Sequence, residues 1–158
     1  MRKPKIYLDT SVISHLKQDD APDKMKDTLK LWEEIKQGEY EVYVSTVTLE
    51  ELGACYEPKR SMLLDRLNSI EFTLLDTNIE IAQFANEIIN QGILTSKSLD
   101  DCTHIALAVS NNCDIIVSWN FKHMVNVKTI NGVRAISLFN GYKTIDIYSP
   151  SFLIQRGE

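Results

Sequence analysis

The stretch KIYLDTSVIS, residues 5–14, decides how the rest of the chain is interpreted. It begins with a short apolar run typical of a buried strand, and this run leads directly into the carboxylate of Asp9 and the hydroxyls of Thr10 and Ser11. Strand ends in α/β sheets open onto the ligand crevice, where an acid is often part of a metal or phosphate site. The stretch therefore predicts a polar site at the end of the first strand.

Four further runs have the β-branched and aromatic composition of short strands: 41–45, 72–75, 114–118 and 142–150. Helical patterns lie between them, with apolar residues three or four positions apart, as in Met25, Leu29, Trp32 and Ile35. Up to the strand 114–118 the order is a strand followed by two helices, three times over, and then a fourth strand, and the run 142–150 adds a last strand. This order predicts the α/β class, as a three-layer α/β/α fold around a mostly parallel central sheet.

Length and composition indicate one domain over residues 1–158, because 158 residues with 44% hydrophobic side chains bury a single core. The apolar runs are too short for a membrane span, and the start MRKPKIYLDT does not resemble a secretory signal, so we expect a cytoplasmic protein without a membrane partner. Cys55, Cys102 and Cys113 are odd in number and widely spaced, and we expect reduced packing residues.

The formal net charge of −5 argues against a generic basic nucleic-acid binder, which normally carries a surplus of Lys and Arg. An acidic metal site supplies several of these negative charges by itself, and a local basic patch is compatible with an acidic total. Candidates for such a patch are Arg2, Lys3, Lys5, Lys59, Arg60, Arg66, Lys122 and Lys128. Solvated surface is the commoner role for each of them.

Three acids and one amide are expected at the carboxyl edge of the sheet. Asp9 closes the first strand, Glu51 is expected in the first turn of the helix after the second strand, Asp101 starts a later helix, and Asn120 follows the strand 114–118. Three carboxylates that lie close together repel one another, and a divalent cation removes the repulsion. Oxygen ligands favour Mg²⁺ or Mn²⁺, which can promote hydrolysis of a phosphodiester.

Each of these acids also has a purely structural interpretation. Thr48 and Glu51 have the spacing of a capping box, and Ser98 with Asp101 is a looser version of it. Taken singly, an acid in this position is more often a helix cap than a ligand. Two such acids together with Asp9 at one edge of the sheet favour a metal site over helix caps.

Neighbouring residues remain alternatives. Glu50 or Asp100 would replace the chosen acid if the helix phase differs by one residue. His104 is expected to orient a carboxylate or touch substrate, although a core histidine is at least as common. His123 has a solvated loop as its commoner role, and packing is the safer interpretation of Trp119, which also suits base stacking. His15 is expected at the surface.

Taken together, four elements of the sequence resemble a PIN domain. They are YLDTSVIS, the triplet Ser45, Thr48 and Glu51, the run D-x-x-H-I-A-x-A over 101–108, and IVSWN over 116–120. Within that superfamily the chain is similar to the VapC-like toxins of prokaryotic toxin–antitoxin systems. Each motif alone is weak, but their order and spacing over most of the chain are fairly specific.

The resemblance implies a parallel sheet of about five strands and Mg²⁺- or Mn²⁺-dependent cleavage of RNA. Asp9, Glu51 and Asp101 match the acidic metal-site positions of the family, and Asn120 stands where many members have a fourth acid, so it would steer water or phosphate without adding charge. The resemblance also implies a cognate antitoxin and a homodimer. Possible supporting residues are Thr10, Ser11, Asp100, His104 and Ser118.

Three rival functions come from other classes. A haloacid-dehalogenase-type phosphatase needs a second Asp where this chain has Ser11, and a von Willebrand-type metal-binding module needs Ser where it has Ile13. The third rival is a PIN-like binding or regulatory module with little nuclease activity, which Asn120 and the acidic balance favour. The expected acidic site and the resemblance together favour a metal-dependent endoribonuclease, and the resemblance implies the toxin of a type II toxin–antitoxin pair.

Overall fold

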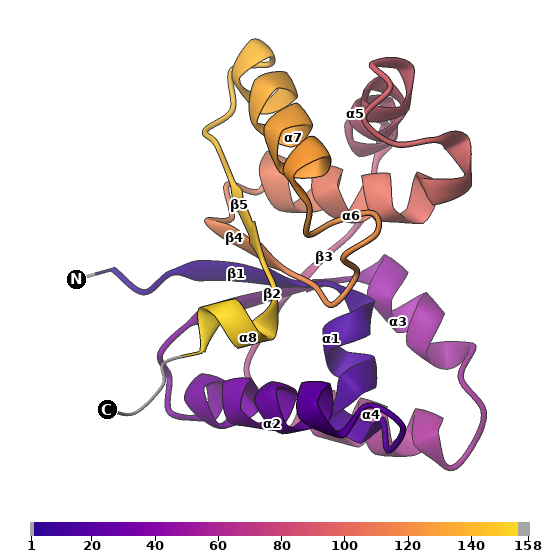
Figure 1. Ribbon diagram of the computed structural model, residues 1–158, viewed down its shortest axis with the longest axis vertical. Helices are drawn as coiled ribbons and strands as arrows, with labels where there is room; N and C mark the ends of the chain where they lie inside the picture. The colour runs from indigo at the N-terminus through magenta and orange to yellow at the C-terminus, as the bar shows by residue number, and fades with distance from the viewer. Residues whose placement is uncertain (1, 155–158) are drawn as a thin grey trace.

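Five parallel strands form the centre of the molecule, in the order β3-β2-β1-β4-β5 (Figure 1). The computed structural model describes residues 2–154. The strands are β1 Lys5–Leu8, β2 Glu41–Ser45, β3 Thr73–Leu75, β4 Ile115–Val117 and β5 Asp146–Tyr148. The predicted α/β class is confirmed, and the sheet is wholly parallel.

Helices cover both faces of the sheet and complete the three layers (Figure 1). The helices α5, α6 and α7 pack on one face, and the other helices lie on the opposite face. Their bounds are α1 Thr10–Ser14, α2 Pro22–Lys36, α3 Thr46–Gly53, α4 Lys59–Asn68, α5 Ile79–Asn90, α6 Leu99–Ser110, α7 Val127–Phe139 and α8 Pro150–Leu153, with 3-10 turns at His15–Lys17 and Ser96–Ser98. Within residues 2–154, no helix has both the length and the apolar character needed to cross a bilayer.

The central strand β1 shows why its sequence is a continuous apolar run. Ile6, Tyr7 and Leu8 are all fully buried, because helices cover the sheet on both sides. Tyr7 points into the core under α5, α6 and α7, whereas Ile6 and Leu8 belong to the core on the opposite face. The alternation of the pleat thus divides one short run between two cores.

The helix α7 is a difference from the sequence prediction, which placed no helix between residues 118 and 142. It begins after Asn126, whose Oδ1 accepts a hydrogen bond of 2.9 Å from the N–H of Thr129. Gly132, a poor helix former, interrupts its apolar pattern. A Cβ at Gly132 would lie 2.7 Å from a side-chain carbon of Ile93, so the glycine permits the close packing of α7. Tertiary packing outweighs local propensity here.

The strand order reverses between β1 and β4. The chain first builds outward from β1 to β2 and β3, and then returns to place β4 and β5 on the other side. In open α/β sheets such a switch point leaves a crevice beyond the carboxyl ends of the two central strands. Asp9 directly follows β1, and the loop containing Asn120 follows β4.

Candidate active site

Asp9 lies at the switch point and is held there by two hydroxyls. Its Oδ2 accepts a hydrogen bond of 2.5 Å from Ser118 and one of 3.0 Å from Ser11. Ser118 directly follows β4, so the bond from Ser118 joins the ends of the two central strands. The other oxygen, Oδ1, accepts no hydrogen bond from residues 2–154 and lies 3.8 Å from Nε2 of His104. One oxygen of the buried carboxylate is therefore fixed by two hydroxyls, and the other is left without a hydrogen bond from the described residues.

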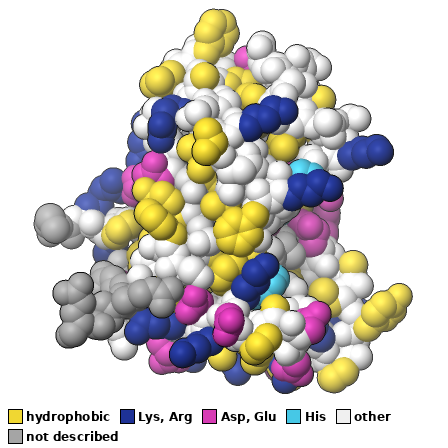
Figure 2. All heavy atoms as spheres, in the orientation of Figure 1, with side chains coloured by type: hydrophobic (Ala, Val, Ile, Leu, Met, Phe, Trp, Pro, Cys, Tyr) yellow, Lys and Arg dark blue, Asp and Glu magenta, His cyan; other side chains and the backbone are white. Residues whose placement is uncertain are grey.

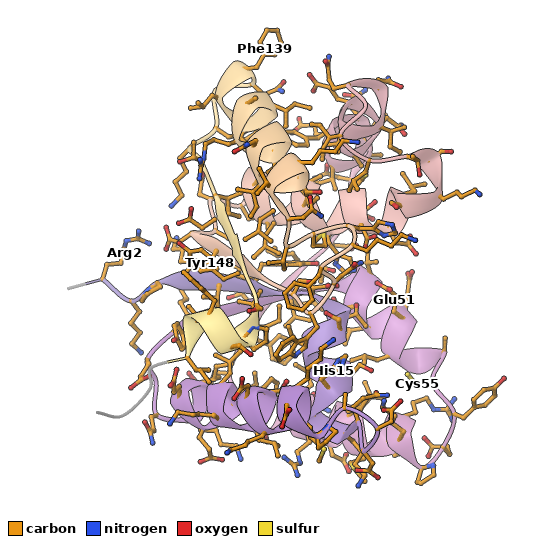
Figure 3. The ribbon with its side chains drawn as sticks, viewed as in Figure 1. Arg2, His15, Glu51, Cys55, Phe139 and Tyr148 are labelled. Carbon is orange, nitrogen blue, oxygen red and sulfur yellow. The ribbon has the colours of Figure 1, made fainter. Side chains whose placement is uncertain are left out.

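Glu51 reaches the same edge from α3. This helix is capped by Ser45, whose Oγ accepts from the N–H of Thr48 at 3.4 Å, and it begins at Thr46. Glu51 therefore lies in the second turn, so its expected place in the first turn and the capping box with Thr48 are both wrong. Its Oε1 accepts a hydrogen bond of 3.0 Å from Thr10. Glu51 lies near the end of the strands opposite Arg2 (Figure 3).

His104 links these two acids to the core. Its Nε2 lies 2.7 Å from Oε1 of Glu51, and its Nδ1 lies 2.6 Å from the hydroxyl of Tyr7. The hydroxyl of Tyr7 donates to Oγ of Ser45 at 2.8 Å, so the contact with His104 needs a proton on Nδ1. Sequence reasoning missed Tyr7, because an aromatic residue inside a buried strand looks like packing alone.

The charges of the site are coupled through His104. Burial lowers the pKa of His104, but the hydrogen bond with Glu51 and the nearby carboxylates raise it further, and the net pKa lies above its usual value. For Glu51, burial raises the pKa, yet the bonds from His104 and Thr10 together lower it below its usual value. Both ring nitrogens of His104 thus lie within hydrogen-bond distance of an acceptor, an arrangement that favours the protonated ring and agrees with its raised pKa.

Asp101 approaches from the first turn of α6, as predicted. Burial, and then the charge of Asp9, raise the pKa of Asp101 above its usual value. Its Oδ2 lies 3.2 Å from Nδ1 of His123, a residue for which a solvated loop was the commoner role. The Oγ of Ser98 lies 3.4 Å from the same nitrogen and does not cap α6, so the looser capping box does not form.

Hydrogen bonds connect the loop after β4 to Asp9 and Asp101. The N–H of Asn120 donates to Ser118, which holds Asp9, and Oδ1 of Asn120 accepts a hydrogen bond of 2.9 Å from the N–H of His123. His123 in turn contacts Asp101. The amide of Asn120 therefore fixes a turn between the two carboxylates.

The alternative candidate residues near the acids lie at the exposed surface or pack in the core. Asp100 and Glu50 are exposed, and neither makes a hydrogen bond or ion pair with another described residue. Trp119 packs in the core, as expected, and its Nε1 donates to Thr28 at 2.8 Å. His15 is not a plain surface residue, because its Nδ1 lies 2.7 Å from the carbonyl oxygen of Ser11 and its ring packs against Trp119.

The residues present suit a hard divalent cation in their chemistry. Among the described residues, one oxygen of each carboxylate accepts no hydrogen bond, namely Oδ1 of Asp9, Oε2 of Glu51 and Oδ1 of Asp101. Yet in residues 2–154 no group of three or more His, Cys, Asp or Glu side chains is arranged to hold a metal ion. His104 lies 3.8 Å from Asp9 and 2.7 Å from Glu51, and when protonated it balances part of their negative charge.

Comparisons with known proteins agree with this architecture. No curated protein sequence matches the chain. Solved structures with this fold include VapBC2 from Rickettsia felis bound to a DNA fragment from their promoter, with 16% identity, a TM-score of 0.54 and coverage of 92% of this chain and 98% of the matched chain. They also include VapBC-1 from nontypeable Haemophilus influenzae, with 16% identity, a TM-score of 0.56 and coverage of 93% of this chain and 98% of the matched chain. A family model described as PIN domain matches residues 6–122. Since this match spans well over half of the chain, the protein belongs to the PIN domain family.

Proposed function

We propose that this protein is a metal-dependent endoribonuclease, with residues 1–158 forming one PIN-like domain. The observation that carries the proposal is the grouping of Asp9, Glu51 and Asp101 at the switch point, where burial, and then the charge of Asp9, raise the pKa of Asp101. A structural site has no need for this repulsion, whereas a cation-binding site uses it.

The free carboxylate oxygens of Asp9, Glu51 and Asp101 would hold Mg²⁺ or Mn²⁺. When bound, such a cation polarises a phosphodiester and activates water for its hydrolysis. The side chain of Glu51 has one oxygen engaged by Thr10 and His104, so its second oxygen is the one available.

The remaining residues of the site orient these ligands. Ser11 and Ser118 fix one oxygen of Asp9, and its other oxygen accepts no hydrogen bond from the described residues. Thr10 orients Glu51, and His104 holds a proton on Nε2 against the carboxylates. Asn120 sets the turn that carries His123 to Asp101 and would steer water or phosphate.

The test is RNA cleavage by the purified protein in Mn²⁺ and Mg²⁺, with EDTA as the blank. We expect Asp9→Asn to remove cleavage while the folded protein persists, because the amide still accepts from Ser11 and Ser118. Glu50→Gln is the matched control, since it removes an exposed acid beside Glu51 and should cleave like the wild type. Cleavage by Asp9→Asn at the wild-type rate would contradict the proposal.

We also propose that the protein is the cytoplasmic toxin of a type II toxin–antitoxin pair and forms a homodimer. The VapBC descriptions of these two solved structures support a cognate antitoxin. Expression of the chain alone should arrest growth, and co-expression of the product of an adjacent small gene should relieve the arrest. Light scattering that shows only monomer at micromolar concentration would count against the homodimer.

A PIN-like binding module with little nuclease activity is the second candidate. The position of His104 between Asp9 and Glu51 favours it, because a histidine cation already balances part of the negative charge. This candidate predicts that the wild-type protein binds RNA but releases no products in Mn²⁺.

A further inference from the structure

Phe121 is an exposed aromatic side chain beside the acidic site. It follows Asn120 in the loop after β4, and 48% of its surface is accessible to solvent. Its ring packs edge to face against Trp119, with the centroids 6.2 Å apart and the planes at 62°. An apolar ring that is half exposed on a surface is available for contact with a ligand.

Trp119 provides a rigid base for that ring. It is buried, its Nε1 donates to Thr28 at 2.8 Å, and its backbone N–H donates to Oγ of Ser11 at 2.9 Å. Ser11 also donates to Asp9. Two consecutive hydrogen bonds therefore connect the base of the aromatic pair to a proposed metal ligand, and the pair is held at a fixed place relative to the crevice.

A lysine lies against the same two rings. The Nζ of Lys24, from the first turn of α2, is 5.6 Å from the ring centroid of Trp119 and 5.5 Å from that of Phe121. Lys24 makes no ion pair with a carboxylate among the described residues, so its charge remains available to an anion. Lys24 was not among the residues that the sequence analysis named as candidates for a basic patch.

The surrounding surface has the same mixture of groups. On the face drawn in Figure 2, hydrophobic side chains near the middle adjoin a Lys or Arg side chain and a histidine. His15, which packs on Trp119 at a centroid distance of 5.8 Å, lies on this face, as its label in Figure 3 shows. Lys122, next to Phe121 in the chain, is also exposed. The positive charge is thus local in a chain whose total charge is negative.

An aromatic ring with a cation beside it matches the chemistry of an unpaired nucleotide. Every nucleobase offers a flat face that stacks on an aromatic ring, and a neighbouring phosphate pairs with the cation. Bases inside a duplex are already stacked on one another, so a ring on the protein surface reaches only a base that is unpaired. A cation is also what a phosphate needs in order to approach an edge that carries three carboxylates.

We propose that Phe121 and Lys24 form a stacking subsite for one unpaired RNA base next to the scissile phosphate. The identity of the ligand as RNA rests on the proposed nuclease function. On this proposal the substrate is single-stranded at that position, and Phe121 determines the preference for unpaired over duplex RNA.

Equilibrium binding in EDTA tests the subsite without cleavage. The probe is a short single-stranded RNA that contains 2-aminopurine, whose fluorescence falls on stacking, and a duplex of the same sequence serves for comparison. We expect Phe121→Ala to weaken binding of the single strand by about tenfold and to abolish the fluorescence change, because stacking on one ring contributes on this scale. Phe121→Trp should keep both signals. Lys24→Ala should weaken binding and reduce its salt dependence.

Phe139→Ala is the matched control, because Phe139 is an equally large exposed ring at the end of α7, far from the loop (Figure 3). It should bind like the wild type. Unchanged affinity and fluorescence in Phe121→Ala would overturn the subsite and leave the ring as a contact for another protein, and so would equal binding of single strand and duplex. Binding that depends on Phe121 without any cleavage in Mn²⁺ would support the subsite while the nuclease proposal fails.

Discussion

The two ends of the parallel sheet differ in how their carboxylates are paired with basic groups. At the amino end, the carboxylate of Asp114 accepts hydrogen bonds of 3.1 Å from the guanidinium of Arg2, 2.6 Å from Nζ of Lys143 and 2.7 Å from the backbone N–H of Lys5. These partners hold the pKa of Asp114 well below its usual value, although burial acts in the other direction. At the carboxyl end, the three candidate ligands have only two histidines as basic partners among the described residues.

The difference separates a structural charge from a functional one. A carboxylate with two cations and a backbone donor is satisfied by the protein itself and stabilises the fold. A carboxylate whose pKa is raised by burial and by another acid, as in Asp101, costs stability in its charged form. Such a cost is expected where binding of a ligand repays it.

The largest expected effect is on catalysis at the carboxyl end. We expect Asp101→Asn to reduce Mn²⁺-dependent RNA cleavage by about a hundredfold or more, since it removes a proposed ligand of the cation. The same change should raise the free energy of unfolding at pH 7 by up to about 1 kcal/mol, because the folded protein then no longer keeps a charge on this carboxyl group. Cleavage assays and urea denaturation measure the two effects, and a destabilised variant with full activity would contradict the comparison.

A divalent cation should stabilise the folded protein through the carboxylates at the carboxyl end and not through Asp114. A ligand at a hundred times its Kd stabilises the folded state by about 2.7 kcal/mol, and thermal unfolding of the wild type in Mn²⁺ should show a corresponding rise in Tm. The rise should disappear in Asp9→Asn and in EDTA, and it should persist in Asp114→Asn. An equal rise in all variants would indicate binding elsewhere.

Loss of the charge at the amino end should affect the fold and leave the chemistry unchanged. We expect Asp114→Asn to lower the free energy of unfolding at pH 7 by about 1–2 kcal/mol, discounted for the solvent exposure of Arg2 and Lys143. Because the folded pKa of Asp114 is depressed, its contribution is present above the pKa of the unfolded chain, near 3.8, and is lost as the pH falls towards the folded value. Denaturation at several pH values should therefore show the two proteins converging in acid, while RNA cleavage by the variant stays at the wild-type rate.

The smallest expected effect comes from a fourth acid at the carboxyl end. Asn120→Asp keeps an oxygen that accepts from the N–H of His123, so the turn should persist. The extra charge should lower the free energy of unfolding by less than about 0.5 kcal/mol without cation and should increase the rise in Tm that Mn²⁺ produces. A stability loss as large as that of Asp114→Asn would show that Asn120 is needed as an amide.

Local composition located all five strands but overextended the last one: the run 142–150 contains only the short strand β5, Asp146–Tyr148, and Pro150 begins α8. It was less reliable for some helices. The run 41–45 forms β2 with the predicted bounds, because its β-branched and aromatic residues have no competing pattern. The helix α7 was missed, because Gly132 serves a contact with Ile93 that is distant in the sequence. The start of α3 was misplaced since the cap is Ser45, three residues before the residue chosen as the cap.

The site shows the same division between local and distant information. The edge at which Asp9, Glu51 and Asp101 lie follows from a parallel sheet, and the sequence was sufficient for it. The links made by Tyr7 and His123 join residues far apart in the chain, so no local pattern points to them. The cation beside Trp119 and Phe121 was hidden for the same reason, because Lys24 comes from α2.

The hydrogen bond from Ser118 to Asp9 also has a consequence for synthesis on the ribosome. Its two ends are separated by 109 positions in the chain, so the first strand emerges long before its neighbour β4 exists. A nascent chain that ends before β4 carries Asp9, Glu51 and Asp101 but lacks Ser118, which binds Asp9 at the switch point. Assembly of the switch point therefore waits until β4 has left the exit tunnel.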